Sequence, residues 1–208
     1  FTGLEGFKSS ILDFILLNLS IIIMAMFIFK KKYFFIIESI KDIDLKNIKN
    51  FGKYSIIYRN NSPENIEILK KFRLKCKIQR IPFFVANNVN LIKALKADGL
   101  YISAYNKNLN YNYLKNNFKI IGSAHNIKEI NLKKLQGCSE IILSRLFKTT
   151  YKNKIDFLGV IKFNLLSKLT KISLTPLGGI NLKNLNNLKN VNCENIALSS
   201  LIKNKSHI

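Results

Sequence analysis

The chain alternates between short apolar runs and longer segments whose apolar residues recur at helical spacing. Short apolar runs bounded by polar residues predict buried strands. The expected strands cover residues 33–37, 54–58, 82–86, 99–103, 119–122, 140–143, 173–177 and 195–198. Helices are expected between them at residues 42–51, 63–77, 89–96, 127–135, 163–169 and 182–190. A weaker, Asn- and Tyr-rich helix is expected before residue 119, and a short closing helix after residue 198.

This order of elements predicts an α/β fold with a parallel sheet. The expected strands lack an alternation of apolar and polar residues, which is typical of strands that are buried on both faces. Eight such units favour a (β/α)8 TIM barrel, although about 175 residues is small beside the ~250 that are typical of that fold. An open, doubly wound sheet is the alternative.

The region before the first expected strand differs in composition. Residues 11–29 are almost wholly apolar and are followed by three lysines. We interpret residues 1–31 as an extension outside the fold or the result of a misassigned start, and residues 32–208 as the barrel. A membrane anchor is the alternative, since an apolar helix of this length just spans a bilayer with the lysines in the cytoplasm. A signal peptide fits less well because no A-x-A-like cleavage site follows.

The chain carries a large excess of positive charge: 34 Lys and Arg against 12 Asp and Glu give +22 over 208 residues. Such a balance suggests a nucleic acid, an anionic membrane or an anionic small molecule as partner. The lysines are spread along the whole chain, and Lys, Asn, Ile and Phe, which AT-rich codons specify, are abundant. We therefore interpret the charge as mostly compositional, with an anionic small molecule as the expected ligand.

Two classes of partner are expected to be absent. No nucleic acid is expected, since the chain has neither an RNA-binding motif nor clustered arginines. A membrane partner is expected only if residues 11–29 are a real anchor. A homo-oligomer is compatible with the sequence.

Cysteine and histidine usage points away from disulfides and zinc. Cys76, Cys138 and Cys193 lie far apart, none has CxxC spacing, and His125 and His207 do not complete a zinc site. Three reduced thiols are typical of a cytoplasmic protein.

Gly178 and Gly179 lie between an expected strand and the expected helix at 182–190. Glycines at such a turn allow close approach of the backbone to a ligand, and the N-terminus of the helix favours an anion. In a TIM barrel, phosphate binds after strands seven and eight, where Gly178, Gly179, Ser199 and Ser200 fall. A plain tight turn and an ordinary helix cap are the alternatives.

Several segments resemble, in the right order, the thiamine phosphate synthase and TenI family. Residues 81–91 and 97–101 resemble its "VPLIINDRVDLAL…ADGVHLGQED" signature, and residues 120–126 its "G-x-S-x-H" segment. Residues 144–152 stand where the family has "GPIFPTPTK", residues 177–180 match "IGGI", and residues 197–202 resemble "AVVSAI". The likeness covers residues 33–202.

The resemblance implies a (β/α)8 barrel that acts in thiamine biosynthesis on a phosphorylated thiazole. The phosphate would be bound at Gly178, Gly179, Ser199 and Ser200. The other substrate-binding positions would be Arg59, Asn87, Ser123, Thr149 and Lys152. The synthase of the family, a transferase, couples the thiazole phosphate to a pyrimidine diphosphate, whose leaving group is held by Mg²⁺.

The chain departs from the family at the positions that serve Mg²⁺ and diphosphate. The family's Asn-Asp pair is Ala86-Asn87 here, and the acidic residue that closes "GQED" is Asn106. Of the family's "Q-x-R-x-K" run only Arg59 is kept, and the second Thr of "TPTK" is Tyr151. Mg²⁺ prefers carboxylate oxygens. We therefore name no metal ligand and expect Mg²⁺ only if the synthase reaction is retained.

One further departure lies in the fifth expected strand, where Gly122 stands one residue closer to Ser123 than in the family. The histidine of this segment, His125, is kept. In the TenI-like thiazole tautomerases of the family, which are isomerases, the histidine at this position moves a proton on the thiazole phosphate carboxylate without Mg²⁺. Imidazole suits such acid/base chemistry.

Three functional hypotheses follow: a thiamine phosphate synthase, a thiazole tautomerase with His125 as acid/base, and a non-catalytic relative that binds a phosphorylated ligand and regulates. The ordinary interpretation of His125 is a hydrogen-bonded residue at a strand end.

Overall fold

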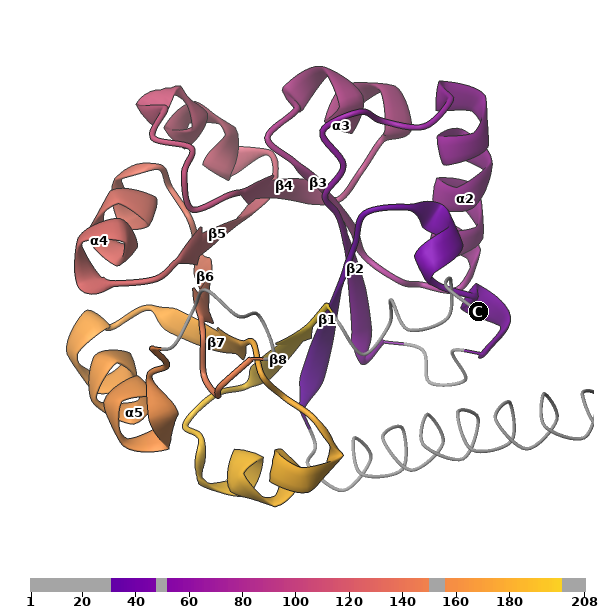
Figure 1. The fold of residues 1–208 in the computed structure, drawn as a ribbon. Helices are drawn as coiled ribbons and strands as arrows, with labels where there is room; N and C mark the ends of the chain where they lie inside the picture. The colour runs from indigo at the N-terminus through magenta and orange to yellow at the C-terminus, as the bar shows by residue number, and fades with distance from the viewer. Residues whose placement is uncertain (1–30, 48–51, 150–155, 200–208) are drawn as a thin grey trace, which may run out of the picture.

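The structure is a computed structural model that describes residues 31–47, 52–149 and 156–199. In these ranges eight parallel strands pair in chain order, and β1 pairs with β8, so the sheet closes into a barrel (Figure 1). The (β/α)8 prediction is confirmed, and closure excludes the open sheet. The strands are β1 Lys32–Ile37, β2 Tyr54–Tyr58, β3 Phe83–Ala86, β4 Gly99–Ile102, β5 Lys119–Ala124, β6 Glu140–Ser144, β7 Ser173–Leu177 and β8 Asn195–Leu198.

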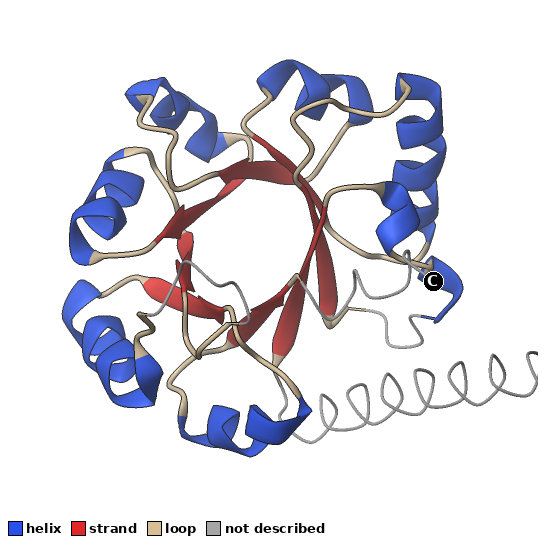
Figure 2. Ribbon diagram, in the orientation of Figure 1, coloured by secondary structure: helices blue, strands red, loops and turns tan. Residues whose placement is uncertain are grey.

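Helices ring the outside of the barrel (Figure 2). Four of those in the described ranges are α-helices: α2 Ile66–Ile78, α3 Val89–Leu95, α4 Ile127–Leu135 and α5 Gly159–Thr170. The others are 3-10 helices: η1 Ile40–Asp42, η2 Leu45–Asn47, η3 Leu109–Asn116 and η4 Leu182–Asn190.

The strands are buried on both faces, as their continuous apolar runs predict. Side chains that point into the barrel form one apolar cluster: Phe34, Ile36, Ile57, Phe84, Tyr101, Ile121, Ile142 and Ala197. The alternate side chains of the strands pack against the helices in a second, larger cluster. A TIM barrel filled in this way is a packed core and not a pore, so ligands bind at its rim.

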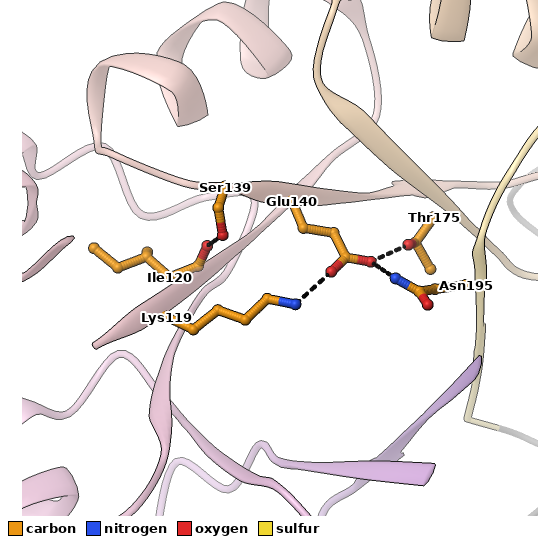
Figure 3. A network of polar contacts seen from close by, with 6 residues as sticks. All are labelled: Lys119, Ile120, Ser139, Glu140, Thr175 and Asn195. Atoms are coloured by element: carbon orange, nitrogen blue, oxygen red, sulfur yellow. Dashed lines mark hydrogen bonds and ion pairs between the residues drawn. The ribbon is translucent and has the colours of Figure 1, made fainter. Parts of the chain in front are cut away.

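A buried polar network lies among the N-terminal halves of the strands (Figure 3). The Glu140 carboxylate accepts hydrogen bonds from Lys119 Nζ at 2.9 Å, from Thr175 Oγ1 at 2.6 Å and from Asn195 Nδ2. Glu140 is 3% exposed, so this charge depends on its partners. Because this end of a TIM barrel serves stability, we assign the network to the fold.

Several helix predictions were wrong in bounds or type. Within the described part of residues 42–51 the chain forms only short 3-10 turns, and α2 begins at Ile66 after the N-cap Asn65, not at Pro63. The segments at 109–116 and 182–190 are helical but of 3-10 type. Both are Asn-rich, and Asn side chains compete with the α-helical backbone by bonding to nearby amides.

The apolar run at 11–29 lies outside the described residues, as does the closing helix expected after β8. Among the described residues, no helix is long and apolar enough to cross a membrane.

Candidate functional site

The closed parallel barrel places the predicted site residues at one rim, because parallel strands all end on the same side. The loops after β2, β3, β5, β6, β7 and β8 begin at this rim. They carry, in that order, Arg59, Asn87, His125, Thr149, Gly178 with Gly179, and Ser199. Ser123 lies near the C-terminal end of β5. Lys152 and Ser200 lie outside the described residues.

His125 directly follows β5 and has an exposed side chain. Its Nδ1 atom lies 3.2 Å from the carbonyl oxygen of Ser144, at the end of β6, and 2.9 Å from Ser144 Oγ. The carbonyl oxygen accepts from a protonated Nδ1, and the hydroxyl either accepts from it or donates to an unprotonated Nδ1, so the two contacts orient the ring in either tautomer. The His125 backbone N–H donates to Glu129 at 2.8 Å, which fixes the start of the loop.

The two glycines after β7 pack against the loop that follows β6. The amide of Phe147 donates to the Gly178 carbonyl at 3.0 Å. A Cβ on Gly179 would lie 2.4 Å from the Phe147 carbonyl oxygen and 2.5 Å from that of Lys148, and both glycines have positive φ. Close approach is therefore required here by the protein's own backbone, and the approach of a ligand to these glycines stays a prediction.

The first turn of η4 is already capped. The Asn181 side chain accepts from the amide of Lys183 at 2.9 Å, and Asn184 Oδ1 accepts from the amide of Asn181 at 2.9 Å. Amides that we expected to face a phosphate are thus bonded within the helix. The pairing of Leu177 with Ala197 places Gly179 and Ser199 two residues beyond matched positions of neighbouring strands. A shared anion site at these two loops stays a prediction.

Arg59 is paired with an acidic residue that the sequence analysis missed. Its Nη2 atom lies 3.1 Å from Glu38 Oε1, and both side chains are partly exposed. Glu38 directly follows β1, so its place after a strand was the available signal. Tyr101, inside the barrel, hydrogen-bonds with Arg59 and Ser123; burial raises the pKa of Tyr101, and these two bonds act against that shift.

Asn87 and Asn106 lie together at the corner of the rim between β3 and β4. Asn106 Nδ2 donates to Asn87 Oδ1 at 3.1 Å, and the backbone amide of Ser103 donates to the same oxygen at 3.1 Å. Asn87 Nδ2 in turn donates to Ser103 Oγ at 2.8 Å. Two neutral amides can pair in this way, whereas two carboxylates would repel one another.

This corner does not fit the Mg²⁺ that the resemblance implies. Both lone pairs of Asn87 Oδ1 are taken by N–H groups, and no carboxylate belongs to the pair. Hard cations bind carboxylate and carbonyl oxygens with free lone pairs. Across the described ranges, no group of three or more His, Cys, Asp or Glu residues is placed to hold a metal ion.

Two residues of the segments that resemble the family, Asp98 and Thr149, lie at opposite ends of the barrel. Asp98 lies before β4, away from the rim, where it bonds Arg73 Nη2 at 2.9 Å and accepts from the amide of Phe83 at 2.6 Å. It therefore supports the fold. Thr149 lies at the rim, and its buried hydroxyl has no hydrogen-bond partner among the described residues. A ligand contact of Thr149 stays a prediction.

The chain is similar to proteins of one family. A model of the thiamine monophosphate synthase family matches residues 44–202. A thiamine-phosphate synthase of Prochlorococcus marinus subsp. pastoris is 32% identical over 148 residues, which cover 70% of this chain and 41% of that protein. Another, from Prochlorococcus marinus strain SARG, is 28% identical over 156 residues, which cover 73% of this chain and 45% of that protein. The chain spans less than half the length of these two relatives.

Solved structures of similar proteins have the same fold. The thiamine phosphate pyrophosphorylase of Pyrococcus furiosus matches with a TM-score of 0.64 at 20% identity, over 85% of this chain and 90% of that one. The thiamine phosphate pyrophosphorylase of Bacteroides thetaiotaomicron matches with a TM-score of 0.56 at 15% identity, over 85% of this chain and 86% of that one.

Proposed function

This chain belongs to the thiamine monophosphate synthase family, and we propose that it is an enzyme of thiamine biosynthesis that binds a phosphorylated thiazole at the barrel rim. The phosphate would be held by backbone amides at Gly178, Gly179 and Ser199, with Ser200 and Lys152 as further expected contacts. The positive net charge favours such an anionic ligand.

Of the two reactions in the family, we propose tautomerisation, with His125 as acid and base. The contacts of His125 Nδ1 with Ser144 carry this proposal, because they orient at the rim an imidazole that can take up and release a proton. His125 would take a proton from one carbon of the thiazole phosphate carboxylate and return it to another. The substrate then neither gains nor loses atoms, and the step needs no diphosphate leaving group.

Coupling to the pyrimidine diphosphate is the second candidate, favoured by the names of the relatives, which are thiamine-phosphate synthases. Two contacts count against it. The charge of Arg59 is shared with Glu38, which opposes the binding of a diphosphate at this position. The Asn87–Asn106 pair lacks the charge that Mg²⁺ needs.

We place the reaction in the cytoplasm. The three cysteines are free thiols, and Cys76 and Cys138 are buried. Unpaired cysteines are typical of a reducing compartment.

The test is an assay of the full chain with thiazole phosphate carboxylate in the presence of EDTA. We expect tautomer conversion that His125→Ala lowers about 10²- to 10⁴-fold, the usual contribution of a general acid/base. His125→Asn is the matched variant, because it keeps polarity but cannot carry the proton.

Two other results would give the site a different function. Product that forms only with both pyrimidine diphosphate and Mg²⁺ would establish the synthase. No product under either condition, with a ligand-dependent rise in melting temperature, would establish a non-catalytic binding protein.

A further inference from the structure

Lys133 is a fully buried cation behind the Asn87–Asn106 corner. It comes from α4, its side chain is 0% exposed, and Nζ donates three hydrogen bonds. The acceptors are the carbonyl oxygens of Ser103 and Asn106, both at 2.8 Å, and Gln136 Oε1 at 2.9 Å. All three ammonium protons are therefore used, and none of these acceptors is charged.

Gly122 makes room for this lysine. A Cβ on Gly122 would lie 2.9 Å from Lys133 Cγ and 2.9 Å from Cys138 Sγ, so a larger residue would push α4 away from β5. This explains the position of the glycine in the fifth strand, which departs from the family's segment. Gly122 and Lys133 act as one feature, because the lysine stem occupies the space that the glycine leaves.

Gln136 extends the same support along the loop after β4. Its Nε2 atom donates to the carbonyl oxygens of Asn106 at 3.0 Å and Asn108 at 2.8 Å. Lys133 and Gln136 thus bind three backbone carbonyls of the loop at 103–108. The loop's other groups, the amide of Ser103 and the side chains of Ser103 and Asn106, meet Asn87.

The hydrogen bonds of the Asn87–Asn106 corner leave some of its donors for a ligand. Asn87 Oδ1 accepts twice, and both Nδ2 protons of Asn106 are used, one by Asn87 and one by the Tyr111 hydroxyl. The second Nδ2 proton of Asn87 and the hydroxyl proton of Ser103 have no acceptor among the described residues. The free groups are therefore donors, which suit an acceptor such as a carboxylate.

We propose that Lys133 is a positioning residue that holds the loop at 103–108, so that Asn87 and Ser103 donate directly to the carboxylate of the ligand without a metal ion. The identity of this ligand rests on the proposed function. A buried ammonium from inside the protein orders the loop, and the ordered loop presents neutral donors.

The first measurement is hydrogen exchange of the free full-length protein, which needs no ligand. Lys133→Met keeps most of the side-chain volume but removes the three donors, and we expect exchange of the amides at 103–108 to become at least about tenfold faster. Lys128→Met, an exposed lysine of the same helix, is the control and should leave exchange unchanged. If Lys133→Met fails to fold, Gln136→Leu should show a smaller change in the same direction.

The second measurement compares the Kd of thiazole phosphate carboxylate with that of the same thiazole phosphate lacking the carboxylate, in EDTA. We expect wild type to prefer the carboxylate about tenfold, the worth of a charge-assisted hydrogen bond. Lys133→Met should lose this preference and keep its affinity for the carboxylate-free ligand. If Lys133 only stabilised the fold, Lys133→Met would weaken the binding of both ligands equally.

The outcomes separate this inference from the proposed function. An Mg²⁺ requirement, no preference in wild type, or unchanged exchange and preference in Lys133→Met would overturn the inference. A carboxylate preference that Lys133→Met abolishes, without any turnover, would exclude the enzymatic function and still support the inference. Turnover together with a carboxylate preference that Lys133→Met does not alter would support the enzymatic function and overturn the inference.

Discussion

The amides of Asn87 and Asn106 determine which ligands this corner of the rim can bind. Asn87 Oδ1 accepts from Asn106 and from the amide of Ser103, so both of its lone pairs are used without a cation. The sequence gives the two residue types, and the resemblance marks both positions as departures. The resemblance does not show that the side chains meet, because that depends on the conformation of the loops after β3 and β4.

Changing both residues to carboxylates should create a metal site. We expect Asn87→Asp with Asn106→Asp to bind Mn²⁺ and wild type not to bind it. We also expect the double variant to be less stable than wild type when the ion is removed, since two carboxylates would then lie side by side. Titration followed by the Mn²⁺ EPR signal measures this. Asn88→Asp with Asn108→Asp adds the same charge at two helix-capping residues outside the pair and should not bind the ion.

The buried thiol of Cys76 should make stability depend on alkaline pH. Burial raises the pKa of Cys76 to about 12 from 9.0. Above pH 9 the unfolded thiol loses its proton while the folded one keeps it, so the unfolded state binds fewer protons and stability falls as pH rises. This contribution is complete below pH 9 and is lost up to about pH 12.

The measurement is the free energy of unfolding between pH 8 and 11, for wild type and Cys76→Ala. We expect wild type to lose stability faster, by at most about 1.4 kcal/mol per pH unit, the linkage limit for one proton. Parallel curves for the two proteins would contradict a protonated thiol in the folded state.

Among the secondary-structure elements, the strands were easier to predict than the helices. β2 and β8 have the predicted bounds, because a strand that is buried on both faces is a continuous apolar run. The helices η3 and η4 are of 3-10 type, although Asn residues cap their first turns as they do in α2, α3 and α4. Apolar spacing is similar in both helix types, so it does not predict this difference.

The loop after β7 was predicted correctly as a glycine turn, but its contact with the loop after β6 was not predicted. Gly179 packs against the carbonyls of the loop after β6. The side chains that act across loops, Glu38 on Arg59 and Lys133 on residues 103–108, were missed altogether. Their partners are distant in sequence, so neither pairing has a local pattern, although Glu38 stands directly after a strand.

Gly179→Ala should therefore be costly. The new Cβ would overlap two backbone oxygens, which cannot move like the end of a side chain, and φ is +70°. We expect a loss of about 3 kcal/mol or more in the free energy of unfolding. Gly52→Ala is the control: φ is +89°, but nothing lies within 4 Å of the Cβ, so only the backbone strain of about 1–2 kcal/mol remains. Equal losses would show that the contact with the β6 loop does not matter.

The polar network that stabilises the barrel and the groups that would bind a ligand lie at opposite ends of the barrel. The Glu140 network lies among the strand starts and joins β5, β6, β7 and β8 (Figure 3). The groups around His125 and the Asn87–Asn106 corner lie at the strand ends. The strands that connect the two ends are apolar inside, so a polar change at one end need not reach the other.

Removal of Glu140 should weaken the fold and leave the rim intact. Glu140→Ala would leave the Thr175 hydroxyl and the Asn195 amide in the core without their hydrogen-bond acceptor. We expect a loss of about 3–5 kcal/mol in the free energy of unfolding. Glu67→Ala removes an acid of the exposed Lys70–Glu67 pair and should change stability by no more than about 0.5 kcal/mol. In the fraction of Glu140→Ala that remains folded, the Kd of thiazole phosphate should match that of wild type. A weaker Kd at unchanged stability would mean that the network serves the site and not the fold.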